Sequence, residues 1–113
     1  MLLHIVGRDE WQPGTQLRVD DTVGFIHCSD PGTIHLPANR FYAGRTDLVL
    51  LEIDQARLDV PVRWEPGDPA EPDGVWFPHV YGPVPAAAVV AVHDFPLPPD
   101  GVFRPPDPVA RRR

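Results

Sequence analysis

The sequence has no lysine and a single cysteine, and these absences narrow the chemistry open to it. All ten basic residues among the 113 are arginine, which excludes a Schiff-base lysine and the phosphate-binding lysine of a P-loop. Cys28 cannot form a disulfide within the chain, nor a zinc or iron–sulfur site built from several cysteines. The cysteine content therefore gives no sign of an oxidising compartment.

Long hydrophobic segments are missing as well. No stretch approaches the roughly 20 apolar residues that span a bilayer. The first residues, MLLHIVGRDEW, carry neither the basic start nor the apolar run of a signal peptide. We therefore expect no membrane partner and a cytoplasmic location.

Acidic residues outnumber basic ones. Sixteen Asp and Glu against ten Arg give a formal net charge of −6, and three of those arginines stand together at residues 111–113. An acidic surface repels the phosphate backbone, so nucleic acid is not expected as a partner.

Proline and glycine are frequent, at 16 and 9 residues, but remain below the roughly 25–30% typical of disorder. The length suits one domain of about 100–150 residues. We predict a single domain over residues 1–95 and an extended or disordered Pro/Arg-rich tail over residues 96–113. Such tails also dock partners in extended form, although a solvated chain end is the more common case.

A strand, then short helices, then mostly strands predict an α+β fold with a small mixed or antiparallel sheet. Residues 47–53 (DLVLLEI) are typical of a central strand covered on both faces. Residues 34–42 predict a helix, short or irregular because it contains Pro37. Residues 66–74 predict a mobile acidic loop, a candidate lid. Further strands are predicted at residues 2–6, 24–29, 60–65 and 86–93, the last of them buried, and ordered structure resumes over residues 75–82.

Three of the five histidines, His4, His27 and His79, stand beside apolar or aromatic residues at predicted strands or their ends. Ordinary packing and a shared site are both open for them. Their spacing matches no metal motif, so no metal is predicted. Strand side chains alternate, so His27 and Ser29 share a face while Cys28 points inward, which disfavours a cysteine nucleophile paired with His27.

Large aromatic residues are many for so short a chain. They either pack in the core or stack on a flat ring such as a base or nicotinamide. The same ambiguity holds for the strand residues Glu52 and Glu65, which could bind a sugar hydroxyl or face water. The aromatic residues in question are Trp11, Tyr42, Trp64, Trp76, Phe77 and Tyr81.

Five segments in this order, LLHIVGRDEW, GFIHCS, ANRFYAGRTDLVLLEID, VRWE and FPHVYGPV, resemble a bacterial family known as domain of unknown function 952 (DUF952). The resemblance covers roughly residues 2–93. It implies an ADP-ribosyltransferase-like fold, in which a split, antiparallel-rich sheet holds NAD in a cleft. Proteins of this fold break the nicotinamide–ribose bond, using a strand His or Arg, an aromatic stacked on nicotinamide, and a late Glu, Gln or His.

The resemblance implies roles for individual residues. His4, His27 and His79 are the expected catalytic residues, and NAD is the expected substrate. The late glutamate has no counterpart, since Glu65 precedes the acidic loop rather than opening the last motif. The residues expected to bind NAD are Trp11, Ser29, Phe41, Tyr42 and Tyr81.

Two functions follow from this. The first is an NAD-dependent ADP-ribosyltransferase or glycohydrolase with an unknown acceptor, which the histidine and aromatic residues favour. The second is an inactive module that binds a nucleotide or small ligand, or regulates a partner, which the missing glutamate favours. A neutral imidazole holds a hydroxyl and exchanges protons near pH 7, but it supplies no negative charge to an oxocarbenium-like ribose.

Overall fold

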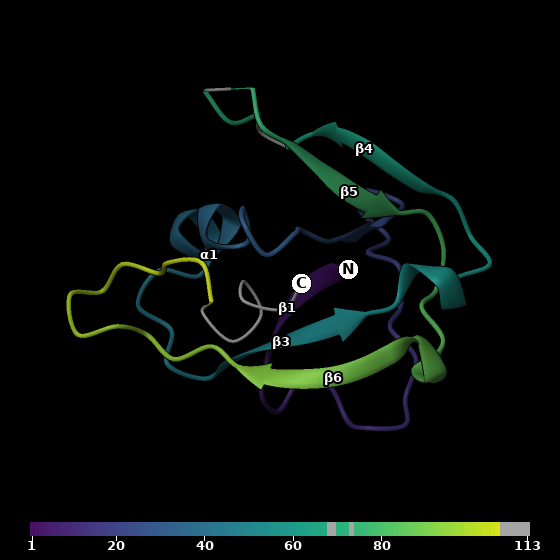
Figure 1. The fold of residues 1–113 in the computed structure, drawn as a ribbon, viewed down its shortest axis with the longest axis horizontal. Helices are drawn as coiled ribbons and strands as arrows, with labels where there is room; N and C mark the ends of the chain where they lie inside the picture. Colours follow the sequence, from purple (N-terminus) through teal and green to yellow (C-terminus); the bar gives the residue numbers. More distant parts are fainter. Residues whose placement is uncertain (68–69, 73, 107–113) are drawn as a thin grey trace.

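The computed structural model describes residues 1–67, 70–72 and 74–106, which form two three-stranded antiparallel sheets and one α-helix (Figure 1). One sheet has the order β1-β3-β6, made of β1 (Leu2–Gly7), β3 (Leu48–Ile53) and β6 (Val89–Asp94). The other has the order β2-β5-β4, made of β2 (Ile26–His27), β5 (Trp76–Val80) and β4 (Val62–Pro66). The predicted α+β class and the mostly antiparallel pairing are confirmed. In the described part of the chain, no helix is long and apolar enough to cross a membrane.

The strand β3 is the middle of its sheet and is buried along its whole length. Leu48 and Leu50 belong to one apolar cluster, whereas Val49, Leu51 and Ile53 belong to another. Successive strand side chains point to opposite faces, so a strand covered on both faces needs an unbroken apolar run. The prediction for residues 47–53 is therefore confirmed.

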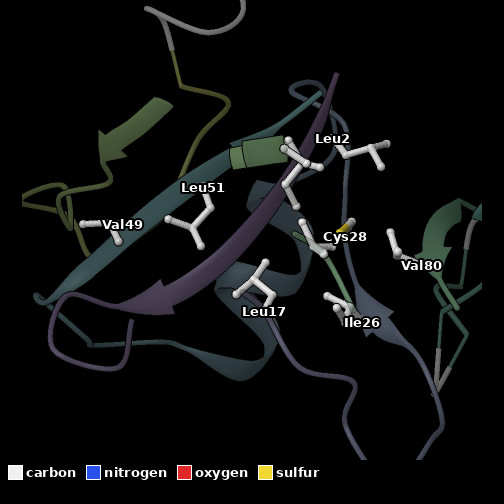
Figure 2. Packing of buried hydrophobic residues seen from close by; sticks show 10 residues of the cluster. Leu2, Leu17, Ile26, Cys28, Val49, Leu51 and Val80 are labelled. Carbon is white, nitrogen blue, oxygen red and sulfur yellow. The ribbon is translucent and has the colours of Figure 1, made fainter. Parts of the chain in front are cut away.

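The apolar cluster that contains Val49, Leu51 and Ile53 joins the two sheets. Leu2 of β1 and Leu51 of β3 pack in one cluster with Ile26 of β2 and Val80 of β5. Figure 2 shows these side chains gathered around one space, with Cys28 among them. Cys28 is thus a small buried apolar residue, as predicted.

A backbone bridge adds to this packing. The amide of Leu3 donates to the carbonyl of Ser29 at 2.7 Å, and the amide of Ser29 donates back to Leu3 at 2.8 Å. These two bonds fix the chain that follows β2 against β1. They therefore fix the position of β2, an edge strand of the second sheet, relative to β1 of the first sheet.

The helix α1 (His35–Phe41) covers the other face of the β1-β3-β6 sheet through Ile34 and Ala38. Pro37 lies in the first helical turn, where backbone N–H groups have no partner within the helix. The helix is accordingly short but unbroken, which agrees with the prediction for residues 34–42.

The segment of residues 96–106 contains no helix or strand but is packed onto the domain. Phe103 is 1% exposed and stacks on Phe95 with 4.9 Å between ring centroids. The side chain of Asn39 accepts from the Phe103 amide at 2.7 Å and donates to its carbonyl at 2.9 Å. The extended or disordered tail expected over residues 96–113 stays a prediction, because residues 96–106 have no helix or strand but are held to the domain at Phe103. Residues 107–113, with the terminal arginines, lie outside the described residues.

The prediction of a buried strand at residues 86–93 is wrong in part. Residues Ala86–Ala88 form a 3-10 turn, as Gln55–Arg57 do after β3. The strand β6 that follows lies at the edge of its sheet, and Val90 and Val92 are 43% and 50% exposed. An apolar run without charges looks buried in the sequence even where one face of an edge strand stays uncovered.

We expect Phe103→Ala to lower the free energy of unfolding by about 3–5 kcal/mol, because it removes a buried aromatic ring from the cluster that contains Leu48 and Leu50. Urea denaturation followed by tryptophan fluorescence measures this change. The control is Val102→Ala, since Val102 is 47% exposed and should matter by less than about 0.5 kcal/mol. Equal stability of the two variants would show that residues 96–106 do not belong to the folded domain.

Candidate functional site

A narrow pocket of about 70 Å³ brings together most of the predicted site residues. Its walls come from β1, the chain through β2, α1 and β5. At roughly 10–15 Å³ for one water-sized sphere, it has room for one small ring or a comparable group. The predicted residues that line it are His4, His27, Ser29, Phe41, Tyr42 and His79.

A larger and more open groove of about 620 Å³ adjoins this pocket. The two share His4, Ile5, His27 and Tyr42 in their walls. Trp11, the seventh predicted residue, lines the groove and not the pocket. The charged residues in the groove walls are Asp9, Glu10, Arg18 and Asp20.

His4 lies at the junction of pocket and groove. Its Nδ1 is 2.6 Å from the backbone carbonyl of His27. A carbonyl only accepts, so Nδ1 of His4 carries the proton. Burial lowers the pKa of the His4 ring, because desolvation disfavours the charged form. The bond to the His27 carbonyl raises this pKa by less, and the neighbouring His27 ring lowers it further, so the pKa is lowered overall. His4 is therefore neutral at neutral pH.

His79 is held by a carboxylate. Its Nδ1 lies 2.9 Å from Oε1 of Glu65, and the Tyr81 hydroxyl donates to the same oxygen at 2.6 Å. The bonds from Tyr81 and then from His79 lower the pKa of Glu65, and the bond to Glu65 raises the pKa of Tyr81. Glu65 is thus ionised and accepts both bonds. Tyr81, the eighth predicted residue, serves this carboxylate and lines neither the pocket nor the groove.

Aromatic rings surround His79, which is 3% exposed. Phe25 stacks on it with 4.0 Å between centroids and an interplanar angle of 19°. The His27 ring lies 5.6 Å away in an edge-on arrangement. Phe77 completes this side of the pocket. Phe25 carries no signal of this role in the sequence, since its place beside His79 depends on the pairing of β2 with β5.

Two charged residues of the pocket wall were also missed. Arg40 of α1 and Glu71 form an ion pair at 3.2 Å, with side chains 31% and 15% exposed. Arg40 also lies over the Phe41 ring at 5.5 Å. Glu71 belongs to the acidic stretch expected as a mobile loop, and residues 68, 69 and 73 of that stretch lie outside the described residues. Its mobility thus stays a prediction.

Cys28 lines the pocket but is not built as a nucleophile. Burial raises the pKa of its thiol to about 12, so the reactive thiolate is absent at neutral pH. Within residues 1–67, 70–72 and 74–106, no group of three or more His, Cys, Asp and Glu side chains is arranged to hold a metal ion. What the pocket offers is imidazole nitrogens, a buried hydroxyl and flat apolar walls.

We expect Tyr81→Phe to raise the pKa of Glu65 toward its ordinary 4.5, because the variant removes the strongest bond to the carboxylate. A ¹³C NMR titration of the Glu65 carboxyl measures this. The lowered pKa in the folded state stabilises the fold above the ordinary glutamate pKa, and this stabilisation is lost as pH falls through the folded-state value. The difference in unfolding free energy between the two proteins should shrink over that range.

The control for this experiment is Tyr42→Phe, whose hydroxyl is not bonded to Glu65. It should leave the Glu65 titration unchanged. A wild-type Glu65 that titrates at the ordinary value would contradict the geometry described for His79.

Comparisons with known proteins agree with the sequence resemblance. The structure is similar to the crystal structure of protein CC0527 from Caulobacter crescentus, with TM-score 0.79 and 29% identity over 96% of this chain and 97% of that one. The solution NMR structure of CC0527 gives a TM-score of 0.72 and 28% identity over 96% of each chain. A search of curated proteins gives no match. The profile of the family described as protein of unknown function (DUF952) matches residues 5–92, so the chain belongs to the DUF952 family.

Proposed function

We propose that the pocket and the adjoining groove bind NAD or a related nucleotide, as in ADP-ribosyltransferase-like proteins. The observation that carries this proposal is the meeting of His4, His27 and His79 in one pocket. Its walls also include the aromatic side chains Phe41, Tyr42 and Phe77. An apolar pocket with a few convergent polar groups is the usual form of a small-molecule site.

The volumes of the pocket and the groove limit how much of NAD can enter each of them. Sites for whole ligands of this size measure roughly 300–1,000 Å³, so the pocket of about 70 Å³ takes only one ring-sized end. The groove of about 620 Å³ can receive the rest. We place the nicotinamide ring in the pocket and the adenine base along Trp11 in the groove, since a base stacks on an aromatic face.

The charges of the groove limit the affinity. Asp9, Glu10 and Asp20 face the space that the diphosphate would enter, against Arg18 as the one cation in the same walls among the described residues. Like charges repel across an open groove, although salt screens them. The binding free energy must therefore come from the two ring ends and not from the diphosphate.

Cleavage of the nicotinamide–ribose bond would release neutral nicotinamide and leave a cationic, oxocarbenium-like ribose. Glu71 is the acidic side chain in the pocket wall and the group able to stabilise such a cation. Its charge is offset by Arg40 at 3.2 Å. This ion pair supports the second candidate function, a module that binds the nucleotide without cleaving it.

We expect NAD to bind the wild-type protein with a Kd in the micromolar range, measured by isothermal titration calorimetry. His4→Ala should weaken binding by at least about tenfold, because it removes a hydrogen-bonding group at the junction of pocket and groove. Val90→Ala is the control, since Val90 is exposed on the β6 edge strand. No heat and no NMR shift change at millimolar NAD would contradict the proposal.

Nicotinamide release from NAD separates the two candidates. For an enzyme we expect release above the rate of NAD alone, and a loss of release in Glu71→Gln while NAD still binds, because the amide carries no negative charge. Chromatographic detection of nicotinamide measures it. Tight binding without release would identify the chain as a binding module and set aside the transferase and glycohydrolase alternatives.

A further inference from the structure

Two imidazoles of the pocket, those of His4 and His79, are each hydrogen-bonded through Nδ1. The His27 carbonyl accepts from Nδ1 of His4, and the ionised Glu65 carboxylate accepts from Nδ1 of His79. In a neutral imidazole one ring nitrogen donates and the other accepts. Wherever the rings are neutral, the partner of Nδ1 therefore determines that Nε2 carries a lone pair.

The Nε2 atoms of both rings are left without a hydrogen-bond partner among the described residues. Within the same residues, Nδ1 of His35 is the only fully buried side-chain polar atom without a partner. Nε2 of His4 and of His79 are therefore not fully buried. Both rings line the pocket, and the His4 ring also lines the groove.

The groups around His79 keep this arrangement in place. Glu65 from β4 is held by Tyr81 as well as by His79, and the Arg63 guanidinium lies 4.9 Å from the centre of the Tyr81 ring. Phe25 stacks flat on the imidazole and restrains its rotation. The carboxylate oxygen thus meets the ring from a fixed direction, which is how a supporting group selects a tautomer.

We infer that Glu65 is a positioning residue which, with the His27 carbonyl, turns the pocket into a pair of hydrogen-bond acceptors. The pocket accordingly takes an uncharged group that carries hydrogen-bond donors, such as a carboxamide or a diol, and rejects a carboxylate or phosphate. This inference rests on the proposed function only in assuming that the pocket binds a ligand.

The remaining polar groups of the pocket agree with this preference. A carboxylate or phosphate brings only acceptors, and these would face two lone pairs. The one arginine in the described pocket wall, Arg40, already pairs with Glu71. An anion would have to break that ion pair before it gained a cation.

The first test is the protonation of the two rings, read from long-range ¹H–¹⁵N NMR spectra of the ligand-free protein at about pH 8, above the usual histidine pKa. We expect protonated Nδ1 and unprotonated Nε2 for both His4 and His79. In Glu65→Ala the Nε2–H form of His79 should appear while His4 stays unchanged. Glu71→Ala removes a carboxylate from the same pocket and should change neither ring.

A protonated Nε2 on either wild-type ring overturns the inference, and so does a His79 tautomer that Glu65→Ala leaves unchanged. Because the wild-type spectrum alone can contradict it, the test does not depend on the folding of any variant. A merely structural role for Glu65 would alter stability without changing the tautomer of a folded His79.

The second test compares nicotinamide with nicotinate, two rings that differ only in a carboxamide against a carboxylate. We expect nicotinamide to bind at least about tenfold more tightly, because nicotinate leaves both acceptors unpaired, and the preference should shrink in Glu65→Ala. Equal or tighter binding of nicotinate, or no binding of either ring, overturns the ligand class. A preference for nicotinamide without any NAD binding would instead uphold it and contradict the proposed function.

Discussion

The backbone bridge between Leu3 and Ser29 is the constraint on which the candidate site depends. It fixes the chain after β2 against β1, and the adjacent residue of β1, His4, then reaches the His27 carbonyl. The pairing of His27 with His79 brings the third histidine to the same place. Three residues far apart in the sequence thus meet because two hydrogen bonds join the edges of two sheets, and the apolar cluster behind them keeps those edges together.

Much of the fold could be predicted from the sequence because single elements carry strong local signals. DLVLLEI has the composition of a strand buried on both faces, and it is one. Residues 86–93 show the limit, since only the tertiary structure decides whether an apolar run lies in the middle or at the edge of a sheet. Phe103 shows another limit. A proline-rich segment looks unfolded in composition, and nothing local reveals that Asn39 binds its backbone.

The site was predictable as a set of residues more than as an arrangement. Histidines and aromatic residues signal a ligand site by type, but the partner of each depends on pairing register. Glu65 reaches His79 because β4 pairs with β5, where Glu65 lies opposite Phe77 and Arg63 lies opposite His79. That register was invisible from the motif order, which made Glu65 look misplaced. The similarity to CC0527 and membership of DUF952 support the fold, while the choice between catalysis and binding depends on the pocket itself.

The packing of Phe103 against the domain connects the C-terminal segment to the helix α1. Asn39, which holds the Phe103 backbone, lies on the same helix as Pro37, Arg40 and Phe41 of the pocket wall. Thermodynamic linkage is reciprocal, so a tension or a fusion that weakens the hold on Phe103 also weakens the helix, and a ligand that stiffens the helix tightens the hold. The helix that forms part of the pocket wall is therefore also the element that anchors the C-terminal segment.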